Sequence, residues 1–137
     1  MITRKCVLAT LAAFVTMYAL GYAIYEWILG SFMAENVGTA TGVMRDPPSF
    51  LHISLGQLAG AGLLATVLSW KGVKSAMAGA RAGAAVGLLL AAYYGFMMLG
   101  TTNTTTMEAV FADVVGSMVM LGGAGAVVAV VMGRGGD

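Results

Sequence analysis

Residues 71–100 read KGVKSAMAGARAGAAVGLLLAAYYGFMMLG. The stretch begins with three bases, Lys71, Lys74 and Arg81, and continues without another charge to Gly100. An α-helix rises about 1.5 Å per residue, so about 20 apolar residues cross the hydrocarbon core of a bilayer, which is about 30 Å thick. The stretch therefore predicts a membrane-spanning helix over about 80–100, with its first residues on the basic side of the membrane.

Three further apolar stretches are long enough to span a bilayer, over about 6–27, 50–70 and 107–132. The 137 residues are 59% hydrophobic and 9% charged, whereas soluble proteins carry about 25% charged residues. Connections this short leave no room for a second domain. We predict an all-α protein, residues 1–137 forming one integral membrane domain, built as an up-down bundle of four transmembrane helices.

The two signs of charge separate along the chain. Six of the seven Lys and Arg residues lie at the start, the middle and the end: Arg4, Lys5, Lys71, Lys74, Arg81 and Arg134. Five of the six acids lie in or beside the other two connections: Glu26, Glu35, Asp46, Glu108 and Asp113. Because Lys and Arg in short loops stay on the cytoplasmic side, we expect both termini on the cytoplasmic side of the membrane.

Small residues recur at helical spacing on two of the predicted spans. Gly83, Gly87, Ala91 and Gly95 follow one another every four residues, and Gly56 with Gly60 forms a GxxxG pair. Small residues let helix backbones approach closely, and van der Waals packing then favours association in lipid. We expect these glycines to be helix-packing positions that hold the bundle together or bind a neighbouring subunit.

Polar side chains within the spans gather at the outer, acidic end. The candidate polar or ligand-binding residues are Tyr22, Glu26, His52, Tyr93, Glu108 and Asp113. An ionisable residue in a span is costly to bury alone, so Asp113 should face the interior and find a partner. Tyr22, His52, Tyr93 and Tyr94 are available for that role.

Three interpretations of this polar cluster compete. The first is an interhelical hydrogen-bond network, which is the usual role of isolated polar residues in bundles. The second is an outward-facing site for a small molecule, a lipid headgroup or a cation. The third is a proton or ion path, which would need titratable groups across the barrier. The inner half holds no carboxylate or histidine, and only Gln57 is strongly polar near the midplane, which disfavours a path.

Motifs of enzymes, cofactors and metal centres are missing from the sequence. It holds no Gly-x-Ser-x-Gly, no HExxH, no CxxC and no phosphate-binding glycine loop. The eleven methionines are not clustered as copper ligands, and Met is a common filler of apolar packing. We therefore expect a protein that is not an enzyme and uses no cofactor or metal.

Several short motifs are similar to those of a group of small bacterial four-span membrane proteins that share a domain of unknown function. They are LGY at 20–22, Tyr25, FM at 32–33, GTATGVM at 38–44, PPSF at 47–50, GTTN at 100–103 and DVV at 113–115. The resemblance extends over nearly the whole chain. The resemblance implies a four-helix membrane fold and a location in the bacterial inner membrane. It implies no activity, cofactor or catalytic residue.

Two functions from different classes remain as hypotheses. The first is a structural or accessory subunit that packs against a larger membrane complex through its glycine faces. The alternative is an oligomeric protein that binds or transports a small molecule or ion at the outward-facing polar site. The expected partners are the lipid bilayer and other membrane subunits or further copies of the chain. A net charge of +1 predicts no nucleic-acid partner.

Overall fold

A computed structural model describes residues 3–134. Its elements are α1 (Arg4–Tyr22), the π-helical segment η1 (Ala23–Ile28), α2 (Gly30–Glu35), α3 (Phe50–Lys71), α4 (Ala76–Thr101) and α5 (Met107–Gly133). Residues 3–134 contain no β-strand, so the prediction of an all-α protein is confirmed.

Four helical stretches are long and apolar enough to cross a membrane. They are α1 continued by η1, with 25 residues, then α3 with 22, α4 with 26 and α5 with 27. A helix of about 20 residues spans the hydrocarbon core, so each of the four has the required length. The four predicted spans therefore correspond to four long apolar helices.

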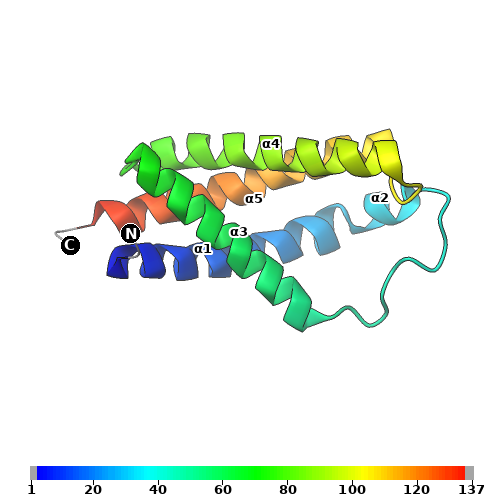
Figure 1. Cartoon of the computed structure of the whole chain (residues 1–137), viewed down its shortest axis with the longest axis horizontal. Helices are drawn as coiled ribbons and strands as arrows, with labels where there is room; N and C mark the ends of the chain where they lie inside the picture. Colours follow the sequence, from blue (N-terminus) through cyan, green and yellow to red (C-terminus); the bar gives the residue numbers. More distant parts are fainter. Residues whose placement is uncertain (1–2, 135–137) are drawn as a thin grey trace.

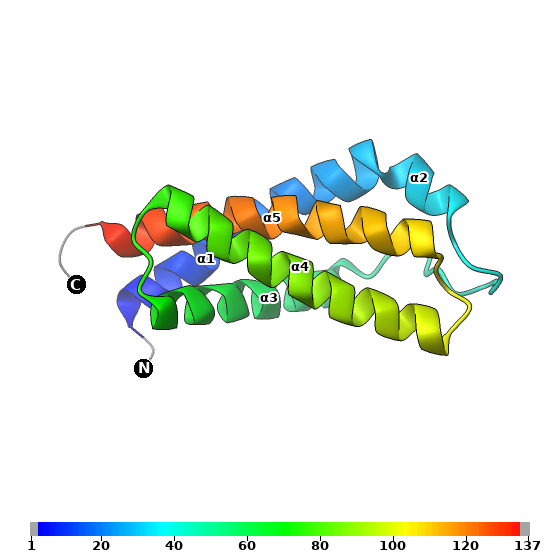
Figure 2. The ribbon, with the colours of Figure 1, turned by 90° about the horizontal axis from the view of Figure 1, so that it is seen from above.

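The chain passes back and forth along the long axis of the molecule (Figure 1). The start of α1, the α3–α4 turn and the end of α5 lie at one end, which we call the basic end. The short helix α2, the long loop after it and the α4–α5 turn lie at the other end, the acidic end, as Figure 2 also shows. Helix α3 crosses the other helices obliquely rather than running beside them.

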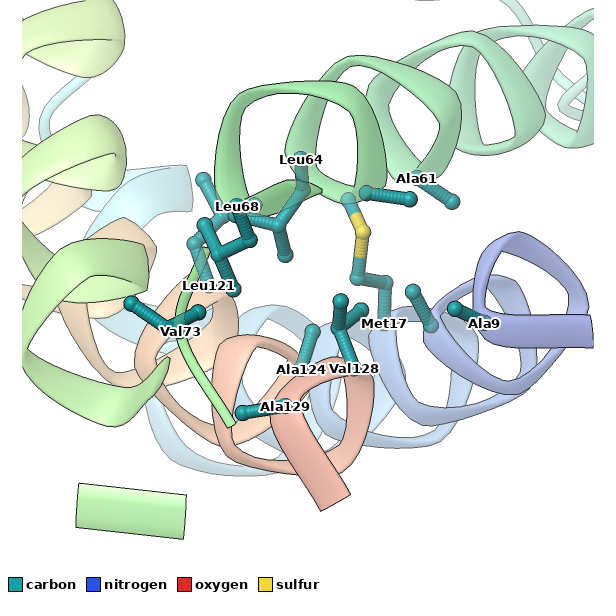
Figure 3. Close-up of a cluster of buried hydrophobic side chains, with 12 residues drawn as sticks. Ala9, Met17, Ala61, Leu64, Leu68, Val73, Leu121, Ala124, Val128 and Ala129 are labelled. Atoms are coloured by element: carbon teal, nitrogen blue, oxygen red, sulfur yellow. The ribbon is translucent and has the colours of Figure 1, made fainter. Parts of the chain in front are cut away.

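The hydrophobic core lies toward the basic end, where α1, α3 and α5 meet (Figure 3). Leu64, Leu68 and Val128 are its largest fully buried side chains. Most other members are alanines, including Ala9, Ala61 and Ala124, so the helices approach closely. In lipid such contacts stabilise a bundle through van der Waals packing, because the surrounding acyl chains are as apolar as the core.

Glycines bring the backbones of α4 and α5 into contact over several turns. A Cβ atom on Gly79, Gly83 or Gly87 would lie 2.2, 2.1 or 2.4 Å from a carbonyl oxygen of α5. Those oxygens belong to Gly125, Leu121 and Ser117 in turn, while a Cβ on Gly95 would meet the side chain of Val110 at 2.8 Å. The glycine face of α4 is therefore covered by α5 of the same chain.

The glycine pair on α3 behaves differently. A Cβ on Gly60 would lie 3.2 Å from the Met17 side chain, but a Cβ on Gly56 would meet nothing within 4 Å. The buried residues of α3 all belong to its second half, from Ala61 to Leu68. Helix α3 therefore packs through the half near the basic end and diverges from the bundle at the acidic end, which leaves Gly56 outside the packing.

The long loop over 36–49 is attached to the α4–α5 turn. The Thr106 hydroxyl donates to the Asn36 carbonyl at 2.9 Å and also caps α5 by accepting from the Ala109 N–H at 3.2 Å. Gly38 lies against Asn103, whose carbonyl oxygen would be 1.9 Å from an added Cβ. These contacts hold the start of the loop in place at the acidic end.

Candidate functional site

A π-helical segment changes the direction of side chains at the outer end of the first span. The Leu29 N–H donates to the Ile24 carbonyl at 2.7 Å, which is a bond between residues five apart instead of four. Each such turn holds more residues than an α-helical turn, so the residues after it are displaced from the regular helical faces. Segments of this kind occur often at functional sites.

Tyr25, within η1, forms the polar centre between the first span and α5. Its hydroxyl donates to Asp113 Oδ1 at 2.7 Å and lies 3.0 Å from Ser117 Oγ. A Cβ on Gly116 would lie 3.1 Å from this hydroxyl oxygen, so glycine at that position leaves space for the tyrosine ring. The sequence analysis named other partners for Asp113, and the structure shows that Tyr25 occupies this position.

A large cavity opens where α3 diverges from α1. Its volume is about 800 Å³, and it is lined by the outer part of the first span, the loop before α3, the first two turns of α3 and Met120 of α5. Tyr18, which lines the cavity, is joined to α3 by a hydrogen bond of 2.9 Å between its hydroxyl oxygen and that of Ser54. Cavities of about 300–1,000 Å³ commonly hold small molecules in proteins. We call this space the α1–α3 cavity.

Polar groups line the α1–α3 cavity without being fully paired by the protein. The side-chain amide of Gln57 has no hydrogen bond to any group in residues 3–134, although it lies about 10 Å along α3 from Phe50. His52 Nδ1 pairs with Ser49 Oγ at 2.6 Å, which leaves its Nε2 without a protein partner within the described chain. These groups are available to a ligand or to water.

Charged residues of both signs line the same cavity. Glu26 comes from η1 and Arg45 from the loop before α3, and both are exposed. Apolar side chains, among them Phe50, Ile53 and Met120, complete the lining. The cavity thus combines ionic groups and apolar surface, which suits a molecule with a polar group and an apolar part.

A second, smaller cavity lies on the other side of Tyr25. Its volume is about 320 Å³, and it is enclosed by η1, α2, the end of α4 and the start of α5. Asp113 and Tyr94 line it together with the thioethers of Met33 and Met98. We call it the Asp113 cavity. Because Tyr25 lines both spaces, it forms the wall between them.

The structure separates the six residues that the sequence analysis grouped as one polar site. Tyr22, Glu26 and His52 line the α1–α3 cavity, whereas Asp113 lines the smaller one. Tyr93 and Glu108 line neither cavity, and Tyr93 is 70% exposed. Glu108 lies in the first turn of α5, where a carboxylate is favoured by the helix dipole. The six residues share one end of the molecule without forming one site.

Tyr25, Arg45 and Gln57 are site residues that the sequence analysis did not select. Tyr25 lies at the outer end of the first span, where aromatic rings are enriched at the membrane interface, so its residue type alone did not indicate a site. Gln57 was noted only as a polar residue near the midplane. A side-chain amide within the bilayer core costs free energy unless it is hydrogen-bonded. The presence of Gln57 in a predicted span was therefore the signal that could have indicated a site. No signal pointed to Arg45, whose position depends on the path of the loop.

No family model, curated protein sequence or solved structure matches this chain. The class of the protein therefore rests on the helices themselves. Four helices long and apolar enough to cross a bilayer are what a multi-pass membrane protein requires.

Proposed function

We propose that the chain is a multi-pass membrane protein that binds a small amphipathic molecule in the α1–α3 cavity. The observation that carries this proposal is the Gln57 side-chain amide, which lines the cavity and has no protein partner within residues 3–134. Gln57 is half-buried and its amide is accessible from the cavity, because no buried side-chain nitrogen or oxygen in residues 3–134 lacks a hydrogen bond. Leaving such an amide without a hydrogen bond at this depth of a bilayer would cost free energy. A ligand or water that bonds to Gln57 offsets that cost.

The lining suggests how such a molecule would lie. Its polar group would occupy the outer part, near Glu26, Arg45 and His52, where an anion, a cation or a zwitterion finds an opposite charge or a hydrogen-bonding partner. Its apolar part would contact Ile53 and Met120. The amide of Gln57 would then bond to a polar atom of the ligand that lies deeper in the cavity. Lipids and other amphiphiles that partition into the membrane have this construction.

The membrane and the orientation belong to the same proposal. The basic end carries Lys71, Lys74 and Arg134, and the α1–α3 cavity opens at the acidic end. Lys and Arg in short loops mark the cytoplasmic side, so both termini would lie inside and the cavity would face outward. We assign the chain to a bacterial inner membrane on this basis and on the resemblance described above.

An accessory subunit of a larger membrane complex is the second candidate function. The glycine face of α4 offers it no support, because α5 of the same chain covers that face. The supporting observation is the outer half of α3, where Leu51 and Leu55 are exposed and Gly56 meets nothing in this chain. A partner helix packed on Gly56 would lie beside the α1–α3 cavity, because Gly56 follows the lining residues His52 and Ile53 by four and three positions on α3.

Native mass spectrometry of protein extracted from its own membranes in a mild detergent tests the proposed binding. Wild-type protein should carry a bound small molecule. Ile53→Trp should lose it, because the larger side chain extends into the cavity that Ile53 lines and obstructs binding there. The matched control is Leu55→Trp, since Leu55 is exposed on α3 and does not line the cavity.

Two results would contradict the proposal. One is wild-type protein that carries no small molecule under any extraction that keeps it folded. The other is equal occupancy in the Ile53→Trp and Leu55→Trp variants. Recovery with a stoichiometric protein partner, lost in a Gly56→Leu variant, would instead support the accessory role.

A further inference from the structure

The Asp113 cavity contains one carboxylate and no base. Among residues 3–134, Asp113 is the only charged residue that lines it, and none of those lining residues is Lys, Arg or His. The rest of the wall consists of two tyrosines, two methionines, two threonines and small or apolar residues. This composition differs from that of the α1–α3 cavity, which has charges of both signs.

Asp113 also has no cationic partner elsewhere in the described chain. Its carboxylate accepts from the neutral Tyr25 hydroxyl at 2.7 Å and has no ion pair within residues 3–134. Asp113 lies about 9 Å along α5 from Met107, inside a predicted span. An anionic side chain at such a depth is unfavourable unless a positive charge compensates it. A cation from outside the chain would supply that positive charge.

The geometry points to a binding site for a small substituted ammonium ion in the Asp113 cavity. The carboxylate supplies the opposite charge. The tyrosine rings attract a cation electrostatically within about 6 Å of the ring centre, and aromatic walls are the usual means of binding quaternary ammonium groups. The thioethers of Met33 and Met98 add polarizable contacts for its alkyl groups.

The size and the ligand atoms favour an organic cation over a metal ion. A volume of about 320 Å³ greatly exceeds the share of one water molecule, about 30 Å³, and so suits a molecule of several heavy atoms. Within residues 3–134, no group of three His, Cys, Asp or Glu residues is placed to hold a metal ion. The ammonium group would belong either to a free amine or to a lipid headgroup, and its chemistry is the same in both.

Titration with tetramethylammonium chloride tests this inference. The protein, in an uncharged detergent without added lipid, carries ¹³C-methyl methionine and is followed by NMR. Saturable shifts are expected at Met33 and Met98, which line the cavity, and not at Met97, which does not. Sodium chloride at the same ionic strength should produce no saturable shift.

Two pairs of variants supply the controls. Asp113→Asn should weaken the binding at least about tenfold, whereas Glu108→Gln, which removes a carboxylate from the same helix, should leave it unchanged. Tyr94→Leu should weaken it about two- to fivefold. Its neighbour Tyr93 is also exposed but lines neither cavity, so Tyr93→Leu should have no effect. The tyrosine pair keeps the test valid if Asp113→Asn does not fold.

Nanodiscs distinguish the two sources of the ammonium group. If the site takes a headgroup, discs of phosphatidylcholine should shift Met33 and Met98 without tetramethylammonium, and discs of phosphatidylglycerol should not. If it takes a free amine, the titration should be the same in both discs. Three results would overturn the inference: no saturable shift at Met33 and Met98, wild-type affinity in Asp113→Asn, or an equal response to sodium. None of them bears on the α1–α3 cavity.

Discussion

Adding one methyl group to the glycine face of α4 should separate α4 from α5. In Gly83→Ala the new Cβ would lie 2.1 Å from the Leu121 carbonyl oxygen, whereas ordinary contact begins at 3.4 Å. The obstructing atom belongs to the backbone and cannot rotate away, so the helices must move apart by about 1.3 Å at that point. The contacts at Gly79 and Gly87, one turn away on either side, would loosen as well.

The expected loss follows from two opposing effects. Overpacking of this kind costs about 1–3 kcal/mol, and the weakened dispersion contacts along the helix pair add to it. Replacing glycine by alanine within a helix contributes about 1 kcal/mol in the other direction. We expect the free energy of unfolding of Gly83→Ala to fall by about 2 kcal/mol. Unfolding in mixed micelles with increasing SDS measures it.

Gly56→Ala is the matched control for this prediction. It makes the same chemical change within a long helix, but its Cβ meets nothing within 4 Å. Only the helix propensity changes, so stability should stay the same or rise by up to about 1 kcal/mol. Equal changes in the two variants, or a more stable Gly83→Ala, would refute the close contact between α4 and α5.

Three further predictions concern the outer end and the orientation. Tyr25→Phe should lower the free energy of unfolding by about 1 kcal/mol, because Asp113 loses its hydroxyl donor. The same SDS titration measures this change, and Tyr22→Phe, at an exposed tyrosine, should have no effect. Gly38→Ala should detach the loop from the α4–α5 turn and speed hydrogen exchange of its amides, whereas unchanged exchange would argue against the attachment. Cys6, the only cysteine, should react with an impermeant maleimide in inside-out vesicles and not in intact cells.

The four helices were predictable because hydropathy and length alone determine which stretches can cross a bilayer. The face of α4 was also predictable, since Gly83, Gly87 and Gly95 recur at helical spacing. Its partner was not, because a face of small residues fits any helix that approaches it. The contact between α4 and α5 depends on the small residues of α5 that face α4. It also depends on the path of the chain through the turn at 102–106.

The residues that meet at the acidic end were harder to predict from the sequence, for two physical reasons. Tyr25 lies in a π-helical segment, and such a segment changes the direction of side chains without leaving a periodic pattern in the sequence. The divergence of α3 also separates His52 from Asp113, and a tertiary crossing angle leaves no local pattern in the sequence. The partnership between Tyr25 and Asp113 was missed for the first of these reasons.

Gln57 provides the most direct test of the account, because it is the only glutamine in the chain and labelling glutamine with ¹⁵N reports on it alone. The measurement is a titration of delipidated, labelled protein with an extract of the small molecules and lipids from its own membranes. The account predicts a saturable shift of the Gln57 side-chain amide signal in wild-type and Leu55→Trp protein and no shift in Ile53→Trp. A signal that stays unchanged in folded wild-type protein, or moves equally in all three, would contradict binding in the α1–α3 cavity.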